Sequence, residues 1–316
     1  MRSLKDYMVL VLKGMGMGAA DVVPGVSGGT IAFITGIYEE LINSIKSITP
    51  HNLLLLFRKG GLRLFAEAVN LRFLVCVVLG VGISFLSLAK LMKYLLANHP
   101  VLIWAFFFGL ILASAWYVAK TVPRWGWLTA LCCTLGAASG YLITVSTPAQ
   151  TPETLWFICL SGAIAIVAMI LPGISGSFIL LLLGKYHFMM NAIADLQLPV
   201  IAVFAIGAAI GLIAFSHALS WLLKHHKGLT VALLTGFMLG SLNKVWPWKV
   251  VQQTITDAHG NVRPLVEANV LPSTYELHTQ QPAQLGWAIA LMLLGLAVII
   301  AIERLALRNE APVSEK

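Results

Sequence analysis

Long apolar runs separated by short polar connections dominate the pattern along this chain. Six of the runs come close to the ~20 residues that a helix needs to cross ~30 Å of hydrocarbon. They are residues 72–96, 101–119, 126–145, 199–223, 229–242 and 285–302. The pattern therefore predicts an all-α polytopic membrane protein with about six full transmembrane helices.

Two further apolar regions, residues 14–46 and 155–193, are broken in the middle by proline and glycine. A backbone that leaves helical geometry inside hydrocarbon must find hydrogen bonds in other protein groups or in a water-filled cavity. We therefore expect each region to form a re-entrant helical hairpin that dips into the membrane and returns to its own side.

The two broken regions also resemble each other. Pro-Gly-Val-Ser-Gly-Gly at residues 24–29 returns as Pro-Gly-Ile-Ser-Gly-Ser at residues 172–177. A weaker match pairs residues 76–115 with residues 203–242. The chain thus reads as one membrane domain, residues 1–316, built from two copies of one unit. Its parts are repeat 1 (14–121, hairpin 14–46 plus two spans), a connecting span (126–145), repeat 2 (155–242, hairpin 155–193 plus two spans), an extracytoplasmic loop (246–284) and a last span (285–304).

Composition and charge support this organisation. Apolar residues make up 59% of the chain and charged residues only 11%, roughly half the ~25% typical of soluble domains. The net charge of +8 comes from Lys and Arg in short connections, which the positive-inside rule explains without nucleic acid. The same rule puts both termini in the cytoplasm. Three crossings then separate the hairpins, so they enter from opposite faces as an inverted-topology repeat.

The repeated motif is the candidate substrate site. Its prolines cannot continue a helix, its glycines permit positive φ, and Ser27 or Thr30 can cap the helix that restarts. Each loop would then aim free N–H groups at the membrane midplane, where they could bind an anion. The plainer alternative is that Gly and Pro only kink a helix and allow close packing. The candidate binding residues are Pro24, Gly25, Ser27, Gly28, Gly29, Thr30, Pro172, Gly173, Ser175, Gly176 and Ser177.

Ionisable residues inside the membrane are costly and are functional candidates for that reason. We expect Lys185, with Lys90 and His187, to attract an anion from the outer side, although lysines near span ends also snorkel to the headgroups. Asp21, Glu39 and His217 are candidates for coupling transport to H⁺ or Na⁺, although a lone His on an apolar helix is more often simply packed.

No cofactor or metal site and no enzymatic activity is predicted. The sequence holds no HExxH, P-loop or GxSxG motif, and its four cysteines show no metal-ligand spacing.

Residues 13–30, KGMGMGAADVVPGVSGGT, together with PGISGS at residues 172–177, closely resemble the bacterial polyprenyl-phosphate transporter family. The resemblance implies a flippase in the bacterial cytoplasmic (inner) membrane, which returns undecaprenyl phosphate from the outer to the inner leaflet for cell-wall (peptidoglycan) synthesis. The expected partners are this lipid substrate and membrane lipids. A secondary transporter of a small soluble anion is the alternative that shares the same loops. The oligomeric state is open, and a homodimer is compatible with the sequence.

Overall fold

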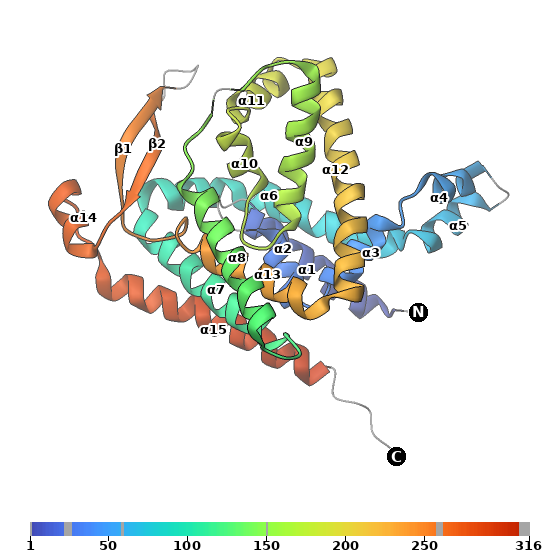
Figure 1. Cartoon of the computed structure of the whole chain (residues 1–316), viewed down its shortest axis with the longest axis horizontal. Coiled ribbons are helices and arrows are strands. Elements are labelled where there is room, and N and C mark those ends of the chain that lie inside the picture. Colours follow the sequence, from blue (N-terminus) through green and yellow to red (C-terminus); the bar gives the residue numbers. More distant parts are fainter. Residues whose placement is uncertain (1, 22–26, 58–59, 150, 257–261, 310–316) are drawn as a thin grey trace.

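The computed structural model describes residues 2–21, 27–57, 60–149, 151–256 and 262–309, and its elements are labelled in Figure 1. The first unit begins with three helices, α1 (Leu4–Asp21), α2 (Gly28–Ile34) and α3 (Tyr38–Lys46). A small helical connection follows, with α4 (Pro50–Leu54), η1 (Leu55–Phe57) and α5 (Gly61–Ala68). Two long helices, α6 (Leu71–Asn98) and α7 (Pro100–Lys120), complete the unit.

The second unit repeats this order of elements. It contains α9 (Leu155–Ile170), α10 (Gly176–Leu182), α11 (Tyr186–Ala194), α12 (Leu198–His225) and α13 (Lys227–Ser241). The matching helices agree closely in length: α2 and α10 have 7 residues each, α3 and α11 have 9, and α6 and α12 have 28. Helix α8 (Trp127–Val145) joins the units, and α15 (Leu285–Asn309) follows them.

Most of the predicted spans are present as long helices. In the described part of the chain, five helices are long and apolar enough to cross a membrane: α6, α7, α8, α12 and α15. The sixth predicted span corresponds to α13, which is apolar but only 15 residues long.

In both broken segments the part of the chain that follows the Pro-Gly turn is divided into two helices. A glycine with positive φ separates the two pieces, Gly36 (φ +73°) before α3 and Gly184 (φ +63°) before α11. In the second unit α10 and α11 bend by 110° at this break. Since a Cβ disfavours this left-handed geometry, glycine at both equivalent positions explains why the chain turns there.

Glycines at matching positions also pack the helix pairs of the two units. An added Cβ would lie 2.2 Å from the Val11 carbonyl oxygen at Gly80, where α6 meets α1, and 1.9 Å from the Cys159 carbonyl oxygen at Gly207, where α12 meets α9. Helix α7 packs on α15, and α13 packs on α8, through close glycine contacts of the same kind. Small residues let apolar helices approach closely where no hydrophobic force distinguishes protein from lipid. The two units thus share an order of helices and a pattern of glycine contacts, whereas the repeat boundaries and the inversion of one copy relative to the other stay predictions.

The first broken segment lies in the centre of the main core. Ile34 of α2 and Ile42 of α3 are almost fully buried, as are Ile111 of α7 and Met238 of α13.

The long loop after α13 is folded, which the apolar pattern did not anticipate. It contains an antiparallel pair, β1 (Lys249–Thr256) and β2 (Val262–Asn269), followed by α14 (Pro272–Thr279). This hairpin projects from one end of the molecule, and the α4–α5 connection projects from the opposite end (Figure 1).

Candidate functional site

The turns of the two broken segments contact each other inside the protein. The backbone N–H of Gly173 donates to Thr30 Oγ1 at 3.2 Å, and the Ser27 hydroxyl donates to the Met169 carbonyl at 3.0 Å. The Tyr38 hydroxyl donates to the Ile170 carbonyl at 3.2 Å. The last carbonyls of a helix have no partner within the helix, so side chains of the first segment satisfy the end of α9.

In the described part of the first turn, residues 28–30 do not present the free amides that the sequence predicted. At the start of α2, Gly28 N–H donates to Asp21 Oδ1 at 2.7 Å, and Gly29 N–H donates to Ser27 Oγ at 3.1 Å. Thr30 N–H donates to the Ser27 carbonyl at 3.0 Å. Ser27 and Thr30 are completely buried, so within the described residues of the first turn the N–H groups of residues 28–30 are occupied and support the fold. Pro24 and Gly25 lie outside the described residues.

The second turn leaves more of its polar groups available. Pro172 and Gly173 are buried in the turn, and Gly173 has φ +92°. The Ser175 and Ser177 hydroxyls lie 2.7 Å apart and bond to each other. Within the described part of the chain, the N–H groups of Gly176 and Ser177 have no hydrogen-bond acceptor.

Lys185 is buried, but its ammonium is directed at the protein backbone. Its side chain is 2% exposed, and Nζ donates to the Thr151 carbonyl at 2.7 Å. The rings of Phe157 and Phe188 lie 5.8 and 5.7 Å from Nζ. Lys185 thus ties the loop before α9 to the break between α10 and α11.

The remaining candidates are dispersed. His187 is half-buried with its ring against Tyr186, and Glu39 forms an exposed ion pair with Lys227 at 2.7 Å. His217 is exposed on α12, and its Nδ1 lies 2.9 Å from the Ile213 carbonyl. Lys90 lies in α6, and its side chain is outside the described part. The structure brings Asp21 to the first turn, as a cap of α2, but it brings neither Glu39 nor His217 there.

A charged cluster that the sequence interpretation missed lies beside the second turn. Lys244, in the turn after α13, and Lys249, at the start of β1, each place Nζ 3.6 Å from Glu267 Oε2 on β2. The pKa of Lys249 is lowered to about 8, chiefly by burial; the charge of Lys244 also lowers it, and Glu267 partly offsets both effects. The predicted outer loop, residues 246–284, contains Lys249 but not Lys244, and the sequence marked neither lysine as a candidate. Only the pairing of β1 with β2 brings both to one carboxylate.

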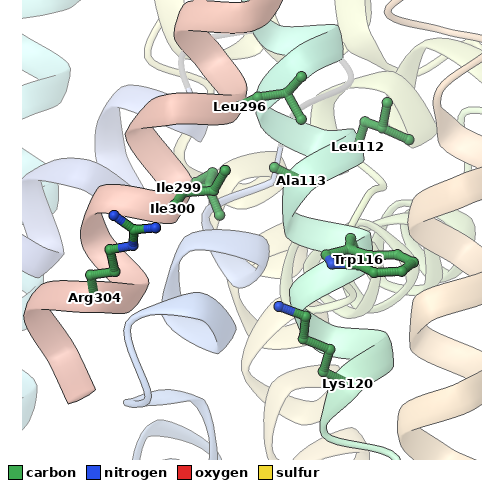
Figure 2. A pocket seen from close by; sticks show the side chains of 8 residues that line it. All are labelled: Leu112, Ala113, Trp116, Lys120, Leu296, Ile299, Ile300 and Arg304. Carbon is green, nitrogen blue, oxygen red and sulfur yellow. The ribbon is translucent and has the colours of Figure 1, made fainter.

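A groove of about 640 Å³ lies between α7 and α15 (Figure 2). Its wall is mostly apolar, and Lys120 and Arg304 extend from the two helices near one end. None of its lining residues belongs to either Pro-Gly turn. The groove is therefore a feature of the outer helix pair and is separate from the turn contact.

These features define a class: a polytopic helical membrane protein in which two repeated, broken segments meet through their polar turns. A family model described as undecaprenyl phosphate translocase-like matches residues 17–263. The chain belongs to this family.

The names of two relatives agree with the family match. A polyprenyl-phosphate transporter of Vibrio cholerae serotype O1 is 46% identical over 301 residues, which cover 95% of this chain and 97% of the relative. A polyprenyl-phosphate transporter of Staphylococcus aureus is 35% identical over 257 residues, covering 75% of this chain and 85% of the relative. No solved structure matches the chain. The predicted family is thereby confirmed.

Proposed function

We propose that this chain moves undecaprenyl phosphate from the outer to the inner leaflet of the bacterial cytoplasmic membrane and so recycles the lipid carrier for cell-wall synthesis. The names of the two relatives support the substrate class. The observation that carries the proposal is the direct contact between the two turns, Gly173 N–H to Thr30 Oγ1. A charged head group can cross hydrocarbon only where polar protein groups replace water.

The two turns would have different tasks. Ser175, Gly176 and Ser177 would bind the phosphate. Among the described residues, the two serine hydroxyls bond to each other, and the N–H groups of Gly176 and Ser177 have no acceptor. Residues 27–30 would hold the second turn in place through the bonds to Met169 and Gly173. Rocking of one repeat against the other would then expose the head group to each leaflet in turn.

Orientation and energy supply complete the proposal. With both termini in the cytoplasm, the β hairpin and α14 would lie outside. Lys90, Lys185 and His187 would then favour an anion on the outer side. Transport would be coupled to H⁺ or Na⁺, with Asp21 as the best-placed coupling group because it alone of the three candidates contacts a turn.

Translocation of a fluorescent polyprenyl phosphate in proteoliposomes tests the site. We expect Ser175→Ala together with Ser177→Ala to slow the initial rate about tenfold or more, since each hydrogen bond to a charged group contributes about 1.5–3 kcal/mol. Thr134→Ala is the matched control, because that hydroxyl is exposed on α8 and bonds only to the carbonyl of Ala130 in its own helix.

Wild-type rates in the double serine variant would overturn the assignment of the second turn. Competition by inorganic phosphate as strong as that by a short polyprenyl phosphate would instead indicate a transporter of a small soluble anion.

A further inference from the structure

Two lysines share one carboxylate next to the second turn. Lys244 Nζ and Lys249 Nζ both lie 3.6 Å from Glu267 Oε2. These three side chains together carry one net positive charge. The side chains are 22%, 8% and 27% exposed, respectively, so the charge is partly shielded from water and still reachable.

Two contacts place the cluster beside the second turn, one through Phe178 and one through Gly173. The Lys244 ammonium lies 4.8 Å from the centre of the Phe178 ring, and Phe178 directly follows Ser177 in α10. Ser241 is the last residue of α13 and lies three residues before Lys244. Its Oγ lies 2.8 Å from where a Cβ of Gly173 would stand. The Lys244 ammonium therefore contacts the helix that begins at the proposed phosphate-binding serines, whereas the Lys185 ammonium contacts the loop before α9.

The ammonium groups keep hydrogen-bonding capacity for a ligand. Lys249 Nζ donates to the Lys244 carbonyl at 2.6 Å and lies 4.1 Å from the centre of the Trp104 ring. An ammonium has three donors, and a separation of 3.6 Å is too long for a hydrogen bond. Glu267 thus balances charge without saturating the donors of either lysine.

We propose that Lys244 and Lys249 form the outer receiving site for a phosphate monoester, and that the phosphate displaces Glu267 as their counter-ion. The inference rests on the proposed function and adds to it the residues that first hold the head group. A phosphate oxygen placed between the ammonium groups would make charge-assisted hydrogen bonds that the carboxylate does not make. The same chemistry would hold a lipid head group or a free phosphate ion, so the test includes both.

Binding of farnesyl phosphate to the purified protein in nanodiscs decides the proposal, with farnesol and inorganic phosphate as comparison ligands. Lys244→Gln and Lys249→Gln should each weaken farnesyl phosphate binding about tenfold, because each removes a shielded positive charge. Glu267→Gln should tighten binding about threefold, since it removes the competing carboxylate. Arg63→Gln is the control, because it removes a positive charge from an exposed pair with Glu67.

The lysine variants and the Glu267 variant are expected to change the affinity for farnesyl phosphate in opposite directions, and this distinguishes a binding site from a purely structural contact. If Glu267→Gln weakens binding as the lysine variants do, the cluster only fastens the β hairpin and the proposal is wrong. The Glu267 variant decides this even if a lysine variant does not fold. Wild-type affinity in both lysine variants would also overturn it while leaving the proposed function intact. Binding of farnesyl phosphate no stronger than that of farnesol would instead count against the proposed function itself. Equal competition by inorganic phosphate would assign the site to the free ion.

Discussion

Gly29 lies where the first broken segment passes closest to the end of α9. A Cβ at this position would stand 2.3 Å from the Ile170 carbonyl oxygen and 3.1 Å from its carbonyl carbon, and these backbone atoms leave little room for adjustment. The same carbonyl accepts the Tyr38 hydroxyl. Residue 29 therefore controls how closely the two turns approach.

We expect Gly29→Ala to lower the free energy of unfolding by about 1–3 kcal/mol, the usual cost of overpacking, and to slow transport by displacing the second turn. Thermal unfolding in detergent and the proteoliposome assay measure the two effects. Gly82→Ala is the matched control, because nothing lies within 4 Å of a Cβ added there on α6. Equal stability of the two variants would show that the turn contact is looser than described.

At the same scale, the serines show what residue identity can and cannot indicate. Ser27 and Ser175 occupy equivalent positions in the repeated motif, yet Ser27 caps α2 and bonds to α9, whereas Ser175 bonds to Ser177. Both copies of the motif place polar side chains at a turn. Which turn has free donors depends on the neighbours that each turn meets.

Among the elements, the short helices after the two turns depend on their caps. Helix α2 has only 7 residues, too few to be stable alone, and its first amide donates to Asp21 at the end of α1. Asp21 thus joins two helices across the undescribed residues 22–26. This contact gives Asp21 a structural task beside the proposed coupling role.

Substitutions of Asp21 separate these two tasks. Asp21→Ala should lower the free energy of unfolding by about 1 kcal/mol, as the loss of a helix cap does. Asp21→Asn should keep near wild-type stability, because the amide oxygen can still accept from Gly28. Unfolding midpoints of the two variants provide the measurement, and an equal loss in both would show that the charge matters rather than the cap. Transport by Asp21→Asn at the wild-type rate would remove Asp21 from the coupling candidates.

At the scale of the whole molecule, the order of helices in the first unit recurs in the second. The proposed inversion concerns the side of the membrane on which each connection lies. Helix α4 belongs to the connection inside the first unit, and α14 follows the β hairpin at the opposite end of the molecule (Figure 1). The proposed topology puts α4 in the cytoplasm and α14 outside.

Single cysteines test this topology in a background where Cys76, Cys132, Cys133 and Cys159 are replaced by alanine. Both His51 of α4 and Ser273 of α14 are exposed. We expect an impermeant maleimide to label Ser273→Cys in intact cells and to label His51→Cys only after the membrane is opened. Labelling of both positions from the same side would contradict the proposed topology.

The sequence by itself determined that the chain lies in a membrane, that its fold is helical, where most of the spans lie, and that a polar turn motif occurs twice. These follow from local quantities: the length of an apolar run is set by bilayer thickness, and proline and glycine act on their own backbone. The tertiary structure decided which polar groups are occupied. Lys185 was expected to attract an anion and is bonded to Thr151, whereas Lys244 and Lys249 were not candidates and meet at Glu267 beside the second turn. Whether a donor is free depends on partners distant in sequence, and only the folded chain brings these together.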